Sequence, residues 1–257
     1  MSTQARSGRA GGRHDCRVRL RRAIDAFAPL RCRFCDLPSD TGTGVCAVCR
    51  GELRRNGSAC RRCALPLPLP GDAGTVRRRL CGDCLHAPPP LSRVLAPFVY
   101  DPALAWLIAQ WKYRRDEALA DTLAALWLWA TAAPPAVDCL LPIPLHWRRQ
   151  LWRGFNQSAD LSRALALRLS IPPPAVRGGP RLRRRRRTPA QAGARRRVRR
   201  RQLRGAFELR GGVTGLRVAL VDDVCTTGAT AEAAATVLLH AGAREVQLWC
   251  LGRTPRR

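Results

Sequence analysis

The chain has 257 residues, and its 46 basic side chains outnumber its 18 acidic ones, which gives a formal net charge of +28. Hydrophobic residues make up 46% of the chain, a share typical of a globular protein and too high for a disordered basic one. The charge favours acidic partners such as phosphate esters or nucleic acid. Lys112 is the only lysine, so the excess is almost wholly arginine, which a coding bias of the genome would also produce.

The N-terminal residues are basic and are not followed by the apolar segment of a secretory signal. We expect residues 1–29 to form a disordered tail. The longest uncharged apolar stretch, residues 122–137, contains Pro134-Pro135 and is shorter than the roughly 20 residues that cross a membrane. We therefore expect a cytoplasmic protein without membrane insertion, in a compartment that keeps thiols reduced.

Eight of the twelve cysteines form four C-x-x-C pairs before residue 85. Each pair can point two thiolates at one ion, and two pairs complete a closed tetrahedral zinc site. The sequence leaves the pairing open between sequential and cross-brace arrangements, and predicts one or two structural zinc ions in a double-zinc-finger-like module over residues 30–88. Disulfides in a secreted domain are the alternative, which the missing signal disfavours. The eight ligands are Cys32, Cys35, Cys46, Cys49, Cys60, Cys63, Cys81 and Cys84.

Beyond the prolines of residues 87–90, apolar strand-like runs alternate with helical spacing through a predicted domain over residues 91–253. We expect strands at 95–100, 138–144, 216–221 and 245–251, and helices around 104–111, 119–127, 161–169 and 229–241. This order predicts an α/β fold with a mostly parallel sheet flanked by helices. Ligands of such sheets bind beyond the carboxyl ends of the strands.

The stretch V-A-L-V-D-D-V-C-T-T-G-A-T at residues 218–230 predicts a buried strand, two acids, a loop and a helix. The unpaired amides at a helix N-terminus suit a phosphate, whereas Asp222 and Asp223 suit ribose hydroxyls or Mg²⁺. Together they indicate a site for a sugar 5-phosphate. The stretch is not a Walker loop, because it lacks the Gly-Lys-Ser/Thr ending. The alternative is a capped helix whose acids merely face solvent.

This stretch resembles the PRPP-binding motif of type I phosphoribosyltransferases. The resemblance implies that Asp222 and Asp223 hold the ribose hydroxyls and Mg²⁺ of PRPP. It assigns the 5-phosphate to a loop made of Thr226, Thr227, Gly228, Ala229 and Thr230. Purine-salvage members carry an aspartate where Thr226 stands here, which argues against transfer to a purine base.

With the cysteine module included, the chain resembles the ComF family over roughly residues 30–253. Four further segments carry this resemblance: L-I-A-Q-W-K-Y at 107–113, P-I-P-L-H at 142–146, R-G-F-N-Q at 153–157, and R-T-P-A-Q at 187–191. The family joins a cysteine module to a type I phosphoribosyltransferase-like domain. The resemblance implies binding of PRPP or a related ribose phosphate with Mg²⁺. It also implies a part in natural transformation, in which members help incoming single-stranded DNA reach the chromosome.

The resemblance also places a pyrophosphate loop in residues 142–156, where Arg148, Arg149, Arg153 and Gly154 would meet the diphosphate. His146 and Lys112 are the candidates for a catalytic role. The arginine-rich segment 178–204 is predicted to be a mobile loop that closes over a diphosphate or clamps a DNA backbone. A solvated loop enriched in arginine by coding bias is the alternative. The loop residues singled out are Arg187, Thr188, Gln191 and Arg199.

Two functions remain open from the sequence. One is a PRPP- and Mg²⁺-binding phosphoribosyltransferase-like protein, whose acceptor the sequence does not name. The other is a non-catalytic accessory protein that binds single-stranded DNA through the zinc knuckles and the arginine-rich segment, with the DNA-uptake machinery as a partner. Only the first requires the pair of acids, and only the second predicts steeply salt-dependent binding without PRPP.

Overall fold

A computed structural model describes residues 30–39, 41–68, 80–114, 117–131, 133–145, 154–171, 179–185, 203 and 205–256. The predicted tail, residues 1–29, lies outside this set. The chain divides into two compact units, one ending at Arg50 and the other beginning at Gly51.

The first unit is built around the first two C-x-x-C pairs. A tight turn carries Cys32, whose amide donates to the Leu37 carbonyl at 2.7 Å and whose carbonyl accepts from the Asp36 amide at 2.9 Å. Helix α2 (Ala47–Gly51) begins directly after Cys46. Among the described residues of this unit, the buried apolar side chains are those of Cys32 and Val45. A metal ion therefore has to supply much of the folding free energy of this unit.

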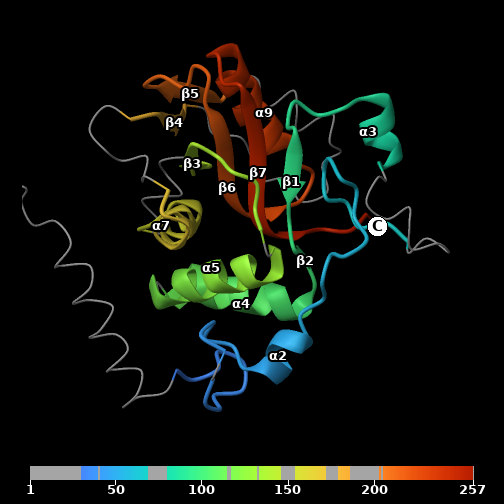
Figure 1. Ribbon diagram of the computed structural model, residues 1–257, viewed down its shortest axis with the longest axis vertical. Coiled ribbons are helices and arrows are strands. Elements are labelled where there is room, and N and C mark those ends of the chain that lie inside the picture. Colours follow the sequence, from blue (N-terminus) through green and yellow to red (C-terminus); the bar gives the residue numbers. More distant parts are fainter. Residues whose placement is uncertain are drawn as a thin grey trace, which may run out of the picture. The chain divides into compact units, whose positions relative to one another are not determined.

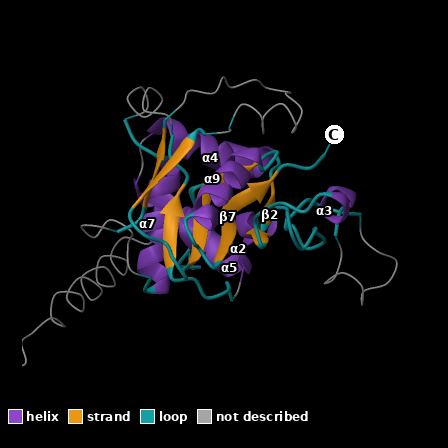
Figure 2. Ribbon diagram, turned by 90° about the horizontal axis from the view of Figure 1, so that it is seen from above, coloured by secondary structure: helices purple, strands orange, loops and turns teal. Residues whose placement is uncertain are grey.

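The second unit contains a parallel sheet in the order β1 (Arg93–Leu95), β7 (Glu245–Arg253), β6 (Arg217–Cys225) and β3 (Cys139–Pro142). A fifth strand, β2 (Phe98–Val99), pairs in parallel with the end of β7. Figure 2 shows these strands enclosed by helices. The predicted α/β class and parallel sheet are confirmed.

Two of the expected strands differ from the structure by more than one or two residues at their ends. The strand expected at residues 95–100 is split into β1 and β2, with Ala96 and Pro97 between them. Pro97 lacks an amide hydrogen and cannot continue the ladder. The strand expected at 216–221 continues to Cys225, so that Asp222 and Asp223 lie within β6 rather than after it. They do so because β6 still pairs with β7 at Cys250 and Gly252.

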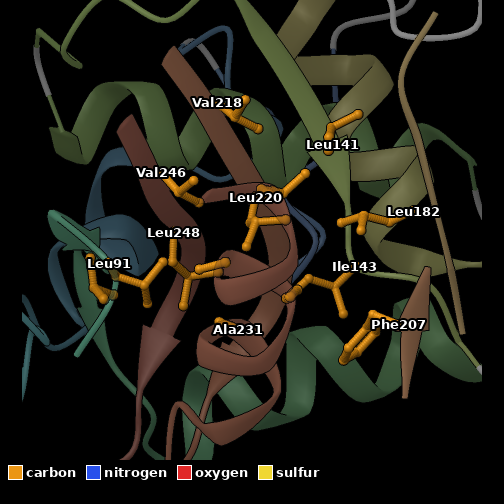
Figure 3. Close-up of a cluster of buried hydrophobic side chains, with 14 of the residues drawn as sticks. Leu91, Leu141, Ile143, Leu182, Phe207, Val218, Leu220, Ala231, Val246 and Leu248 are labelled. Atoms are coloured by element: carbon orange, nitrogen blue, oxygen red, sulfur yellow. The ribbon is translucent and has the colours of Figure 1, made fainter. Parts of the chain in front are cut away.

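Helices cover both faces of the sheet (Figure 1). On one face, Trp127 of α5 (Glu117–Thr131) stacks on Trp249 of β7 with ring centroids 5.0 Å apart. On the other, Leu220 and Leu248 share a core with Ala231 of α9 (Ala229–His240), as Figure 3 shows. Side chains alternate along a strand, so Leu248 and Trp249 necessarily point to opposite faces.

Two further helices frame the edge of the sheet where the acids lie. Helix α4 (Pro102–Arg114) follows β2, and α7 (Gln157–Leu169) packs against β3 and β6. Asn156 caps α7 by accepting a hydrogen bond from the Ser158 amide at 3.2 Å. The helix ends at Ser170, which has the left-handed φ of 55°. These caps fix where α7 begins and ends beside β6.

A short antiparallel pair, β4 (Arg181–Arg184) and β5 (Phe207–Arg210), borders the arginine-rich segment. Leu182 and Phe207 face the same core as α9. The start of the segment predicted as a mobile loop is thus a paired strand, whereas residues 186–202 lie outside the described set.

The last two C-x-x-C pairs belong to the second unit. An isolated antiparallel bridge joins Ala59 to Pro66 on either side of the Cys60–Cys63 pair, and helix α3 (Gly82–His86) carries Cys84. Within the described part of the chain, no helix combines the length and apolar character needed to cross a membrane.

Candidate functional site

The eight predicted cysteine ligands form two clusters, each made of two consecutive C-x-x-C pairs. The thiol sulfurs within each cluster lie within 4.8 Å of one another. The Sγ atoms of Cys35 and Cys46 are 3.7 Å apart, and those of Cys63 and Cys81 are 3.6 Å apart. Tetrahedral zinc with bonds of about 2.3 Å separates its sulfur ligands by about 3.8 Å. Both clusters therefore fit zinc, and the sequential pairing is the one adopted.

The second cluster is the more buried of the two. Cys60, Cys81 and Cys84 are each at most 5% exposed, and Leu65 packs against them. The Cys81 amide donates to Cys60 Sγ at 3.3 Å. A hydrogen bond from the Cys63 thiol, opposed by burial and helped by backbone amides, lowers the pKa of Cys60 to about 4. A stabilised thiolate is the form that binds zinc, and four thiolates leave no position for a substrate, so the role is structural.

The two acids of β6 lie at the end of the sheet among polar groups from two helices. The Ser158 hydroxyl, in the first turn of α7, donates to Asp222 Oδ1 at 3.0 Å. The Lys112 ammonium, from α4, forms an ion pair with Asp223. Both partners of that pair are less than a quarter exposed. The structure thus brings together Lys112 and the two acids, which the sequence placed in separate segments.

Burial raises the pKa of Asp222 to about 7, and the negative charge of Asp223 adds to this effect. The Asp223 amide, the Ser158 hydroxyl and the Lys112 ammonium act in the opposite direction. The pair therefore changes charge near neutral pH, and a bound cation would favour its doubly ionised form.

The threonine-rich loop joins β6 to α9. Gly228 is the N-cap of α9 with a φ of +77°, a conformation that other residues rarely adopt. The amides of Thr227 and Gly228 donate no hydrogen bond to a described residue, while the Ala229 amide reaches Thr227 Oγ1 at 3.4 Å. Free amides at the start of a 12-residue helix are suited to an anion.

The segment predicted as the pyrophosphate loop starts at the end of β3, next to the acids. The Ile143 amide donates to the Val221 carbonyl at 2.9 Å, and Asn156 Nδ2 donates to the Ile143 carbonyl at 3.3 Å. The two ends of this segment thus meet beside β6. Gly154 is exposed with a φ of +78°. The other predicted residues lie outside the described set: His146, Arg148, Arg149 and Arg153 here, and Arg187, Thr188, Gln191 and Arg199 in the arginine-rich segment.

Sequence reasoning missed two residues that contact the site. Ser158 immediately follows the R-G-F-N-Q segment, and this adjacency was the one signal available. Arg253, at the end of β7, donates to the carbonyls of Cys225 and Thr226 beneath the loop. No pattern in the sequence distinguishes it from the many other arginines.

The fold and clusters define a protein with two four-cysteine zinc sites and an α/β domain whose parallel sheet is flanked by helices. The double zinc ribbon domain model matches residues 23–85. DNA utilization protein YhgH of Salmonella typhi is 37% identical, over 88% of this chain and 98% of the relative. Its counterpart in Escherichia coli strain K12 is 36% identical over the same shares. Competence protein F of Haemophilus influenzae is 32% identical, over 81% and 96%. The chain belongs to the ComF family, with these proteins as relatives.

Proposed function

We propose that this protein binds PRPP or a related ribose phosphate, together with Mg²⁺, at the ends of β6 and β3. The observation that carries the proposal is the position of Asp222 and Asp223, six and five residues before Gly228, the N-cap of α9, whose amide donates no hydrogen bond to a described residue. The carboxylates would accept hydrogen bonds from ribose hydroxyls or ligate Mg²⁺, and the loop from Thr226 to Thr230 would hold the 5-phosphate.

Lys112 has a distinct part in this proposal. Its ammonium forms an ion pair with Asp223. A bound divalent cation would take over that neutralisation, and the ammonium would then be free to donate to a diphosphate oxygen. Mg²⁺ would supply charge neutralisation at the diphosphate. Arg148, Arg149, Arg153 and Gly154 are proposed to meet the diphosphate, and His146 remains the second candidate for a catalytic role.

The biological role proposed is DNA uptake or utilisation, because the relatives are named for DNA utilization and competence. The net charge of +28 supports a single-stranded nucleic acid as a partner, through the zinc ribbons and the arginine-rich segment with Arg187, Thr188, Gln191 and Arg199. The DNA-uptake machinery is the proposed protein partner. The proposed location is the cytoplasm, because that compartment keeps cysteine ligands reduced.

The ribose-phosphate site is tested by calorimetric titration of the zinc-loaded protein with PRPP and Mg²⁺. We expect saturable binding that weakens at least a hundredfold in the double variant Asp222→Asn/Asp223→Asn. The matched control is Asp138→Asn, which removes a carboxylate that is paired with Arg217 at the opposite end of β6. Absence of binding by the folded wild type, or equal binding by the double variant, would refute the proposal.

The DNA-binding role is tested by the salt dependence of binding to a labelled single strand. Phosphate contacts release counterions, so the logarithm of the affinity should fall linearly with the logarithm of the salt concentration. The slope should not change in the double variant Asp222→Asn/Asp223→Asn. A flat dependence would rule out binding through the arginines.

A further inference from the structure

Arg253 lies between the second zinc cluster and the phosphate loop. It is the last residue of β7 and only 8% exposed. Its Nε donates to the Cys63 carbonyl at 3.1 Å. Its Nη1 donates to the carbonyls of Cys225, at 3.0 Å, and Thr226. One side chain thus connects a zinc-ligand residue to the first residues of the loop.

The partners of Arg253 are unusual for a buried guanidinium. Its hydrogen bonds with described residues all go to backbone carbonyls, the fourth being that of Thr254 at 2.8 Å, and none goes to a carboxylate. A buried charge that has no ionic partner depends on its hydrogen bonds for stability. If one of these carbonyls moves away, the guanidinium therefore shifts its position. The carbonyls that it still binds then shift with it.

The backbone of Arg253 is held in the sheet at its carbonyl, whereas the amide that follows it shares the Cys225 carbonyl with the side chain. Its carbonyl accepts from the Tyr100 amide at 2.9 Å, and the following amide, of Thr254, donates to the Cys225 carbonyl at 3.1 Å. In the ladder, Arg253 is paired with Cys225. The carbonyl of Arg253 is thus anchored in the sheet, the direction of its side chain is set by the carbonyls that it reaches, and the Thr254 amide reports on one of them, that of Cys225.

We propose that Arg253 is a positioning residue that makes the phosphate loop depend on zinc in the second cluster. Zinc holds Cys63 in its knuckle turn, the Cys63 carbonyl holds Nε, and Nη1 then holds the loop carbonyls in place. Loss of this metal releases the knuckle, removes the acceptor of Nε and loosens the loop. The consequence for ligand affinity rests on the proposed PRPP site, whereas the change in the loop itself does not.

The experiment is NMR spectroscopy of the full-length, ligand-free protein, with two readouts near Arg253. These are the hydrogen-exchange rate of the Thr254 amide, which is bonded to Cys225, and the amide resonance of Gly228 in the loop. Cys63→Ser removes a ligand of the second cluster, and Cys35→Ser removes a ligand of the first, which belongs to the other compact unit. The amides of Val218 and Leu220 in β6 report whether the sheet is still folded.

We expect Cys63→Ser to speed exchange at Thr254 at least tenfold and to shift or broaden Gly228, whereas Cys35→Ser leaves both unchanged. Arg253→Gln should produce the same changes with both zinc ions still bound, by metal analysis. Arg217→Gln, which breaks the ion pair with Asp138, should leave the loop signals unchanged. If Cys63→Ser unfolds the sheet, the zinc-loaded Arg253→Gln protein decides the question.

Two results would overturn the inference. One is an unchanged loop in Arg253→Gln with the sheet folded. The other is an equal response of the loop to Cys35→Ser and Cys63→Ser. A PRPP titration of the same samples separates the two proposals, because zinc-dependent loop signals without any PRPP binding would leave the positioning role standing and remove only the ligand.

Discussion

Replacing Asp222 by asparagine should stabilise the folded protein at pH 8. Burial is the main cause that raises the pKa of the Asp222 carboxyl from its ordinary value of 3.8 to about 7. When the pKa of an acid is higher in the folded protein than in the unfolded chain, the free energy of unfolding falls as the pH rises from the unfolded pKa through the folded pKa. The loss approaches about 4 kcal/mol above pH 7, since each pKa difference of one corresponds to about 1.4 kcal/mol. Roughly 1 kcal/mol of it develops between pH 6 and 8.

The asparagine keeps an oxygen that can accept from the Ser158 hydroxyl and the Asp223 amide, which the carboxylate now binds at 3.0 and 2.9 Å. The variant should therefore gain stability without losing these hydrogen bonds. The assay is urea unfolding of zinc-loaded protein at several pH values between 6 and 8.5, followed by tryptophan fluorescence, to which the buried Trp127 and Trp249 contribute.

The matched control, Asp138→Asn, should change the stability of the folded protein in the opposite direction. Hydrogen bonds from Arg217 lower the pKa of Asp138 to about 2, so its carboxylate stabilises the fold above pH 4 and Asp138→Asn should destabilise it throughout the measured range. The reasoning would be refuted if Asp222→Asn were less stable than the wild type at pH 8, or if its advantage did not shrink towards pH 6.

Three further outcomes are expected. Lys112→Met should raise the pKa of Asp222 further, because the Lys112 ammonium favours the ionised form of the two acids. The measurement is an NMR titration of the carboxyl groups, and an unchanged pKa would contradict the ion pair. Gly228→Ala should lower stability by about 1–3 kcal/mol and weaken PRPP binding, because a φ of +77° strains alanine although the nearest atom to a new Cβ is 3.6 Å away; unchanged unfolding in urea would show that the loop relaxes freely. Cys84→Ser should lose one zinc ion per chain by metal analysis, and retention of both ions would show that this thiol is not a ligand.

The fold could be predicted well because its signals are local. The apolar residues of β6 and β7 and the spacing of α9 identify these elements without any knowledge of their partners. The split between β1 and β2 is also local, since Pro97 interrupts the ladder there. The extension of β6 through Asp222 was missed because two adjacent acids are typical of a strand end, and only the pairing with β7 keeps them in the sheet.

The site was predictable where a motif carries it and hidden where tertiary packing creates it. Asp222, Asp223 and Gly228 lie within one seven-residue stretch of the sequence, which the motif identifies without knowledge of the fold. The contact of Lys112 with Asp223 depends on how α4 packs, and 110 intervening residues give no sign of it. The zinc pairing was open for the same reason, because all four pairs have identical internal spacing and only their folded positions separate Cys49 from Cys60.

The attachment of the second zinc ribbon to the sheet changes where this protein can be divided. Asn56 Nδ2 donates to the carbonyl of Ala64 in the ribbon and to that of Ala96 between β1 and β2. Ala64 itself, next to the ligand Cys63, is part of the main hydrophobic core. A truncation placed after the last cysteine pair would therefore cut into that core. A truncation at Arg50, the boundary between the two compact units, would instead remove no residue of that core.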